Sequence, residues 1–511
     1  MEFRADVIIA CSAVVLISSL IYQLGWRLGL REVTKKTRKP RRRMKVNENN
    51  NGPEVIIVGS GILGSAMATV LARDGRKVTV IERDMKEPDR IVGELFQPGG
   101  RQALTELGLG DCASGFEEIR MDGFVIYDPI TKEPIDFQYP KDKAGKIQPA
   151  TCFHHGRFVM SLRKAAMAEE NVTYIEGTVT TIIEEKGRIV GVEYKKKGQQ
   201  EKEILRAPLT IVADGTFSKF RKQFSTASPE QMTKPTSYFI AFKLKESFDF
   251  KAHHAEGLWC HSTPTIVYRI APDTLRLMFD IDTSVQPKNP KQFIMETIYP
   301  ELPEHLKKMV GPAMENDSVR IRIVPTYYIP SAPVQKPGCL LLGDALNCRH
   351  PYTASGMTVA FKDVKCWADL LEGIESLDDE EAMAEALNFF QKQRRPAHAL
   401  AINIFAQCVK TVLFTKDRYL SKLRLGGYHY VLLGGECLDG PLRIYGGLEP
   451  RPTLLLYHFL ALNLYTAYYL LKSAPWYAKP LALLDGPLVF IRSSVMFFSL
   501  WLSECKSVTQ S

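Results

Sequence analysis

The chain has 511 residues, of which 45% are hydrophobic and 24% charged, so it is neither a disordered protein nor a small single module. Its formal net charge of +9 at pH 7 is concentrated in residues 27–45, and elsewhere the charges nearly balance. A basic run beside an apolar run is more typical of a membrane topology signal or an anionic-lipid contact, so we expect no nucleic-acid partner.

The first expected element is an apolar segment over residues 7–26, VIIACSAVVLISSLIYQLGW, which contains no charged side chain. About 20 such residues are enough to cross the hydrocarbon core of a bilayer. A cleaved signal peptide fits less well, because the positive charges follow the apolar run rather than precede it. We therefore expect a membrane anchor over 1–26 and a basic linker over 27–53, with the rest of the chain in the cytosol.

Residues 55–84, VIIVGSGILGSAMATVLARDGRKVTVIERD, specify a buried strand, a glycine turn, a helix and a second strand ending in an acid. Gly59, Gly61 and Gly64 have the G-x-G-x-x-G spacing, which permits a tight turn, the approach of a pyrophosphate and close helix packing. Glu82 lies about 20 residues beyond, where a carboxylate binds ribose hydroxyls. The stretch predicts FAD or NAD binding, and a turn with only a packing role is the alternative.

Short strand-like runs begin at residue 123 and leave the doubly wound order, which suggests an inserted sheet. Residues 236–328 alternate further strand-like runs with one helical stretch, as expected of a domain that covers the substrate. His154 and His155 do not predict a metal site, because adjacent residues on a helix face apart and no acid or cysteine is spaced to complete one. The ten cysteines form no CxxC pair and indicate inert thiols of a reducing compartment.

Two later strands end in polar turns, ADG at 213–215 and GD at 343–344, and the chain becomes helical beyond residue 367. Residues 453–471 and 481–502 are each apolar and long enough to span a bilayer. The second segment contains acidic, basic and proline residues, so we expect both helices to lie in or dip into one leaflet rather than form a spanning hairpin.

The order of the glycine turn with its acid, the ADG turn and the GD turn resembles the single-component FAD monooxygenases of the para-hydroxybenzoate hydroxylase fold. Whole phrases resemble the squalene monooxygenases, or squalene epoxidases, of sterol synthesis over nearly all of the chain from residue 55. These phrases are VTVIERDMKEPDRIVGELFQPGG, FHHGRFVMSLRKAAMAEE, PLTIVADGTFSKFRK, LLLGDALNCRHPYTASGMTVAFKD and the later LGGEC and KP.

The resemblance implies an α/β fold in which a Rossmann-like FAD-binding domain is interrupted by a mixed-sheet substrate domain and followed by membrane-associated helices. The expected divisions beyond the linker are FAD-binding segments over 54–235 and 331–445, a substrate domain over 236–330 and C-terminal membrane helices over 446–511. The implied activity is epoxidation of squalene to (S)-2,3-oxidosqualene with O2, at the endoplasmic reticulum membrane. Because only one dinucleotide fingerprint is present, the electrons would pass from NADPH through a cytochrome reductase.

The resemblance also implies which residues bind FAD, and it implies no metal. In the glycine turn and its acid these are Gly59, Gly61, Ile62, Leu63, Gly64 and Glu82. Further along they are Arg83, Arg90, Leu95, Arg163, Val179, Asp344 and Met357.

Two departures from the family pattern bear on activity. Ala354 and Ser355 stand where the family usually has two glycines, and Phe124 stands where an active-site tyrosine is common. We expect the first change to be harmless, provided neither position needs a positive φ. Two alternatives are a flavin oxygenase that acts on another long lipid alkene, and a catalytically silent flavoprotein that serves as a membrane scaffold.

Overall fold

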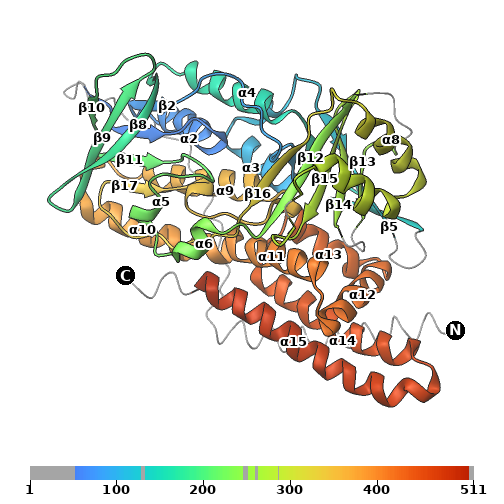
Figure 1. The fold of residues 1–511 in the computed structure, drawn as a ribbon. Coiled ribbons are helices and arrows are strands. Elements are labelled where there is room, and N and C mark those ends of the chain that lie inside the picture. The colour runs from blue at the N-terminus through green and yellow to red at the C-terminus, as the bar shows by residue number, and fades with distance from the viewer. Residues whose placement is uncertain (1–51, 128–132, 246–250, 259–262, 286, 506–511) are drawn as a thin grey trace.

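The computed structural model describes residues 52–127, 133–245, 251–258, 263–285 and 287–505. The predicted N-terminal anchor and nearly all of the basic linker lie outside the described residues. The described chain forms two seven-stranded sheets, a three-stranded sheet and a group of C-terminal helices (Figure 1).

The first large sheet carries the glycine turn. Its strand order is β10-β9-β8-β2-β1-β11-β17, with the last five strands parallel and the first two joined by antiparallel pairing. The strands are β1 (Val55–Val58), β2 (Val78–Glu82), β8 (Val172–Glu185), β9 (Arg188–Lys196), β10 (Glu203–Arg206), β11 (Leu209–Val212) and β17 (Cys339–Leu341). Every residue of β1 and β11 is buried, as expected of parallel strands covered on both faces.

The carboxyl ends of these parallel strands meet at one edge, where ligands of open α/β sheets bind. Three helices pack together beside the sheet: α2 (Ile62–Arg73), α4 (His155–Met167) and α9 (Gly356–Leu371). A small sheet links this part to the next and consists of β3 (Leu95–Phe96), β4 (Ile119–Met121) and β7 (Ala150–Cys152), beside helix α3 (Pro98–Glu106).

The second large sheet is mixed, because β13 pairs in parallel with β5 while its other pairings are antiparallel. Its order is β16 (Arg322–Thr326), β12 (Ser237–Lys245), β15 (Thr274–Ile281), β14 (Thr265–Ala271), β13 (His254–Leu258), β5 (Gly123–Tyr127) and β6 (Pro134–Gln138). Helix α8 (Glu304–Glu315) covers one face, through Leu306 and Val310. The expected inserted mixed sheet is thus present, assembled from two separate stretches of the chain.

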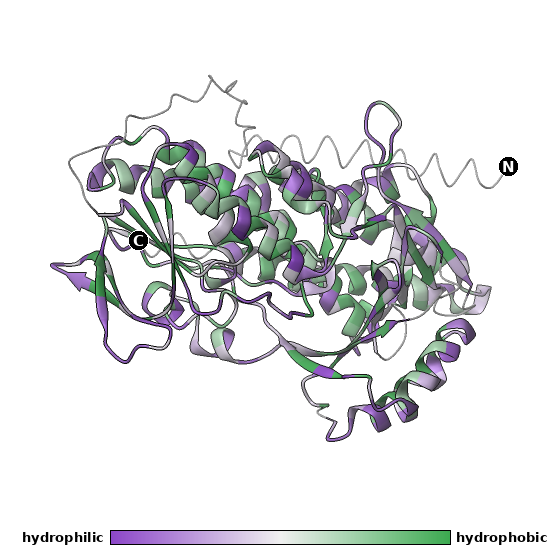
Figure 2. Ribbon diagram, turned by 90° about the horizontal axis from the view of Figure 1, so that it is seen from above, coloured by the Kyte–Doolittle hydropathy of each residue, from purple (hydrophilic) through white to green (hydrophobic). Residues whose placement is uncertain are grey.

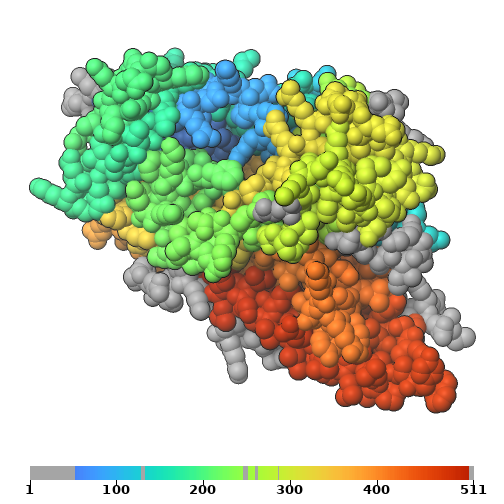
Figure 3. Space-filling model, in the orientation of Figure 1, coloured from blue at the N-terminus to red at the C-terminus, as the bar shows by residue number. Residues whose placement is uncertain are grey.

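The C-terminal helices lie against both sheets and then extend away from them (Figures 1 and 3). They are α10 (Glu380–Arg394), α11 (Leu400–Phe414), α12 (Arg418–Leu432), α13 (Glu436–Tyr445), α14 (Pro452–Ser473) and α15 (Lys479–Cys505). Figure 2 shows hydrophobic residues concentrated on the central helices and strands, with hydrophilic residues toward the periphery.

Three helical stretches are long and apolar enough to cross a membrane: Glu380–Phe414, Pro452–Ser473 and Trp476–Cys505. The first is 56% buried within the protein over its most apolar window, so it is largely a core element. The other two are 33% buried, which leaves most of their apolar surface facing outward.

Candidate active site

The three glycines of the fingerprint occupy three different environments. Gly59 has φ +100°, and a Cβ there would lie 2.7 Å from the carbonyl oxygen of Ala213. A Cβ on Gly64 would lie 2.0 Å from the carbonyl oxygen of Gly59, so this position holds α2 close to β1. A Cβ on Gly61 would meet no protein atom within 4 Å. The space beside Gly61, at the N-terminus of α2, therefore fits a pyrophosphate.

Glu82 ends β2 directly beside this turn. Its carboxylate accepts hydrogen bonds from the backbone N–H of Ser60, at 2.6 Å, and from that of Asp84, at 3.1 Å. A guanidinium nitrogen of Arg163 lies 3.5 Å from the same carboxylate. The acid is thus fixed at the strand end where a ribose would be bound.

Arg163 is buried and uses its guanidinium to hold this region together. It donates to the carbonyl oxygens of Ser60, at 2.9 Å, Asp84, at 3.1 Å, and Lys86, at 3.2 Å. These contacts join the glycine turn to the loop after β2, so Arg163 holds the turn in position.

A cavity of about 670 Å³ begins at this turn and runs through the molecule. It passes the strand ends, the inner face of the second sheet and the C-terminal helices, and Figure 3 shows a hollow between the regions coloured blue, green and yellow. The predicted site residues that line it are Gly61, Ile62, Leu63, Arg90, Leu95, Phe124, Asp344 and Met357. Those that lie outside its lining are Gly59, Gly64, Glu82, Arg83, Arg163 and Val179.

Asp344 is held at the cavity by contacts between two strand ends. Its carboxylate accepts a hydrogen bond from the hydroxyl of Thr216, at 3.0 Å. The buried Arg221 donates to the carbonyl oxygens of Asp344, at 2.7 Å, and Thr216, at 2.8 Å. Sequence reasoning missed Arg221, since nothing distinguishes it from the exposed Lys219 and Lys222 beside it.

The condition on which we expected the departure at Ala354 and Ser355 to be harmless is not met, because Ala354 needs a positive φ. Ala354 has φ +49° and ψ +29°, in the left-handed region, whereas Ser355 has φ −93°. The left-handed conformation costs a residue with a Cβ about 1–2 kcal/mol. The turn still leads directly into α9 at Gly356, and the hydroxyl of Ser355 pairs with that of Thr353 at 3.0 Å.

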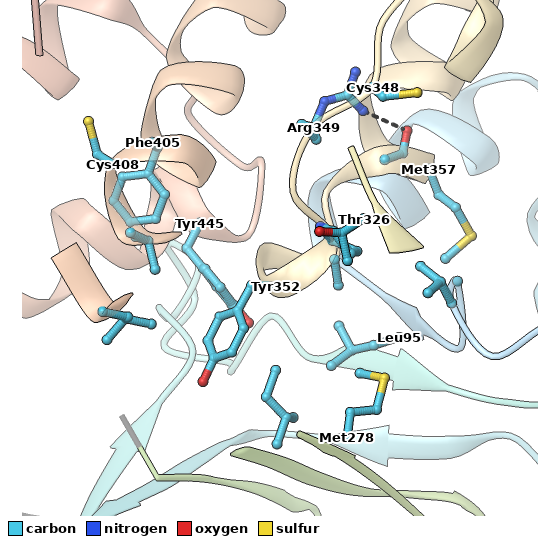
Figure 4. Close-up of a pocket in the computed structure, with 18 of the residues that line it drawn as sticks. Leu95, Met278, Thr326, Cys348, Arg349, Tyr352, Met357, Phe405, Cys408 and Tyr445 are labelled. Carbon is cyan, nitrogen blue, oxygen red and sulfur yellow. Dashed lines mark hydrogen bonds between the residues drawn. The ribbon is translucent and has the colours of Figure 1, made fainter. Parts of the chain in front are cut away.

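Phe124 lies in an aromatic cluster that lines the cavity (Figure 4 shows Tyr352 and Tyr445 of this wall). Its ring centroid is 5.4 Å from those of both Tyr139 and Tyr445. The hydroxyl of Tyr139 donates to the side-chain oxygen of Gln97, at 2.7 Å, and the amide of Gln97 donates to the carbonyl oxygen of Thr353, at 2.9 Å. A phenol therefore remains next to the site although position 124 carries none, and sequence reasoning missed this group.

A buried ion pair joins the residue before β3 to the second large sheet at the cavity wall. Arg276 donates to both carboxylate oxygens of Glu94, at 2.7 Å each, and the hydroxyl of Tyr268 donates at 3.2 Å. Burial raises the pKa of Glu94, while Arg276 acts in the opposite direction. Nearby, burial lowers the pKa of His155 to about 4. Within the described residues, no group of three or more His, Cys, Asp or Glu side chains could hold a metal ion.

The far end of the cavity lies among the C-terminal helices and is mostly apolar, although Arg424 and His458 also line it. It is lined there by Leu423, Leu455, Phe459, Leu462, Met496 and Phe497. The outer surface of the same helices exposes further large hydrophobic side chains. They include Trp476, at 83%, and Tyr477, Leu481, Leu483, Leu484, Ile491, Val495, Phe498 and Leu502.

The charged residues of α15 that argued against a spanning helix are paired with α12 and its N-cap. Asp485 forms an ion pair with Lys422 and lies 3.8 Å from Arg418. Arg492 forms an ion pair with Asp417, at 2.8 Å. Asp485 therefore lies on the buried side of α15 that meets the protein, whereas the side chain of Arg492 is 53% exposed and reaches Asp417 from the outward side.

Comparison with known proteins gives two family matches. A model described as "Squalene epoxidase" matches residues 206–484, and one described as "Glucose inhibited division protein A" matches residues 54–307. The squalene monooxygenase of Mus musculus is 44% identical over 454 residues, which cover 89% of this chain and 78% of the mouse protein. The squalene epoxidase erg1 of Schizosaccharomyces pombe is 34% identical and covers 89% of this chain and 99% of its own.

Solved structures share the fold at low sequence identity. PqsL, a probable FAD-dependent monooxygenase from Pseudomonas aeruginosa, is 20% identical with a TM-score of 0.57, and the match covers 71% of this chain and 97% of PqsL. The p-nitrophenol 4-monooxygenase PnpA from Pseudomonas putida is 16% identical with a TM-score of 0.61, and the match covers 80% of this chain and 98% of PnpA.

Proposed function

Because the chain belongs to the squalene epoxidase family, we propose that it is an FAD-dependent monooxygenase that converts squalene to (S)-2,3-oxidosqualene. The observation that carries this proposal is the continuous cavity, which joins the dinucleotide turn to an apolar end among α14 and α15. A long hydrocarbon would fit a cavity of this kind, and one of its ends would reach the edge of the sheet where the cofactor would bind.

The described residues fit FAD. Gly61 and the N-terminus of α2 would accept the pyrophosphate, Glu82 the adenosine ribose and Asp344 the ribityl chain. The N-terminus of α9, at Gly356 and Met357, would face the flavin ring and favour negative charge there. Arg83, Arg90, Leu95, Arg163 and Val179 complete the set of cofactor contacts that we propose from the family resemblance.

When bound, FAD supplies the activation of O2 for transfer of one oxygen atom to the alkene. The protein's own contribution is to bind, orient and exclude water. Leu95, Phe124 and Tyr445 form apolar wall beside the cofactor end of the cavity, and Tyr139 holds Gln97 against the loop that leads into α9. The transfer of oxygen to the alkene therefore requires no acid–base pair from the protein.

The exposed apolar surface of α14 and α15 supports association with one leaflet of a membrane. We further propose that the protein resides in the endoplasmic reticulum membrane with its sheets in the cytosol, and that a cytochrome reductase delivers electrons from NADPH. The single glycine fingerprint supports an external donor of electrons, because it serves FAD and leaves no second site of this type in the sequence.

The direct test is to incubate the purified full chain in detergent with FAD, NADPH, reductase and squalene, and to analyse the product. We expect 2,3-oxidosqualene. If another long alkene is epoxidised and squalene is not, the proposed substrate is wrong. If FAD binds and no epoxide forms, the alternative of a silent scaffold, to which the strained Ala354 would contribute, is favoured.

A further inference from the structure

A buried polar network connects the last turn of α15 to the loop that carries Asp344. Glu504 is only 3% exposed, although it lies near the end of a helix whose middle exposes apolar side chains. Its carboxylate accepts hydrogen bonds from the amide of Asn403, at 3.0 Å, and from the hydroxyl of Tyr328, at 2.8 Å. Nothing in the catalytic proposal uses this carboxylate.

The first route from Glu504 passes through α11. The side-chain oxygen of Asn403 accepts a hydrogen bond from Arg349, at 2.7 Å. Arg349 lines the cavity and donates to the carbonyl oxygen of Gly356, the first residue of α9, at 3.4 Å (Figure 4). Three side chains thus connect the end of α15 to the helix N-terminus that faces the proposed flavin position.

The second route passes through the segment after β16. Tyr328 precedes Ile329, whose backbone N–H and carbonyl exchange hydrogen bonds with Cys348, at 2.9 and 3.0 Å. The carbonyl of Ile329 also accepts from the amide of Asn347, at 2.8 Å. Both routes therefore end on residues 347–356, which begin three residues after Asp344.

The network is closed by Asn347, whose side-chain oxygen is the common acceptor. It accepts from Arg349, at 2.7 Å, from Asn403, at 2.9 Å, and from Arg394, at 3.2 Å. Asn347 and Asn403 are fully buried, so loss of one partner would leave polar groups without compensation from water. Such a network favours a single arrangement of α15 relative to the loop.

We propose that Glu504 is a positioning residue that couples the seating of α15 against the protein to FAD binding. This inference rests on the proposed FAD site. Since α15 exposes apolar side chains on one side and holds Glu504 against Asn403 and Tyr328 on the other, the arrangement that would suit a bilayer would also fix, through these two residues, the loop that holds Asp344. By linkage, FAD binding must stabilise the end of α15 to the same extent that seated α15 improves FAD binding.

The test compares FAD affinity of the full chain, stripped of cofactor and reconstituted in lipid nanodiscs, for the wild type, Glu504→Gln and Glu504→Ala. We expect FAD affinity to fall about tenfold in Glu504→Gln, within the range of measured couplings. Glu381→Gln removes an equally sized carboxylate from the exposed side of α10 and should leave the affinity unchanged. Wild-type affinity in Glu504→Gln would overturn the proposal, and this variant keeps the test valid if Glu504→Ala does not fold.

Hydrogen exchange supplies a readout that a general loss of stability would not produce. In the wild type, FAD should slow amide exchange over residues 495–505, and in Glu504→Gln it should not. Asn403→Ala should abolish the same response, and the double variant should lose no more than either single one. If FAD leaves the amide exchange rate at the end of α15 unchanged in the wild type, the coupling is refuted. Failure of the wild type to bind FAD at all would instead refute the proposed function.

Discussion

Gly61 is a glycine that the ligand requires and the fold does not, and its substitution by alanine tests this distinction. Gly61 has φ −81° and ψ −162°, a conformation that alanine adopts freely, and a Cβ there would meet no protein atom within 4 Å. The fold without cofactor should therefore keep its stability within about 0.5 kcal/mol. The added methyl group would, however, occupy the space in which the backbone approaches the pyrophosphate.

We expect Gly61→Ala to lower FAD affinity at least about tenfold, equivalent to about 1.4 kcal/mol. The matched variant is Gly64→Ala, whose Cβ would lie 2.0 Å from the carbonyl oxygen of Gly59. An ordinary contact of a Cβ with a neighbouring heavy atom lies at 3.4 Å or more, so α2 would have to move by more than about 1 Å. Gly64→Ala should therefore lose stability even without FAD.

The assay is thermal unfolding of both variants without cofactor, followed by FAD titration with flavin fluorescence. Gly61→Ala should unfold at the wild-type temperature and bind FAD weakly, whereas Gly64→Ala should unfold earlier. If Gly61→Ala bound FAD as tightly as the wild type does, the pyrophosphate would not lie at this turn, and the proposed cofactor position would be wrong.

Four further outcomes follow from the site. Glu82→Ala should cost about 1.5–3 kcal/mol of FAD binding, measured by titration, and unchanged affinity would remove its ribose role. Asp344→Ala should lose flavin or turnover, and a normally active variant would contradict its assignment to the ribityl chain. Ala354→Gly should raise the free energy of unfolding by about 0.5–1 kcal/mol, because relief of the left-handed strain exceeds the entropic cost of ordering a glycine. Epoxide formation should change little. A rise from no product to clear turnover would instead favour the alternative that the protein is a silent scaffold. Burial lowers the pKa of His155 to about 4, so this side chain contributes stability above pH 6.5 that is lost as the pH falls toward 4, about 3 kcal/mol in all. Denaturant titrations of His155→Gln should therefore show a free energy of unfolding that depends less on pH over this window.

The dinucleotide unit was predictable because its signals are local. A buried apolar strand, three glycines and a strand-end acid lie within about 30 consecutive positions, and the structure places Glu82 beside the turn as the spacing requires. The convergence of the ADG and GD turns at the same edge was also predictable, because parallel strands align their carboxyl ends.

The parts that sequence reasoning missed depend on contacts between distant segments. Arg221, Gln97 and Glu504 resemble many other polar residues in the sequence, and only the fold shows that they are buried and paired across the site. The glycines that the family usually has at 354 and 355 raised the possibility of a positive φ, but nothing local to an alanine or a serine shows which position adopts it. The turn that precedes α9 imposes it.

One cavity extends from the glycine turn into α14 and α15, and this affects how the rate of turnover depends on the concentration of substrate. A substrate that enters from the lipid is present at a two-dimensional density, so turnover should follow its mole fraction in the bilayer rather than its amount per volume of solution. Addition of inert lipid at constant total substrate should then slow the reaction by dilution within the surface. The composition of the membrane would thereby regulate this enzyme without any dedicated effector site.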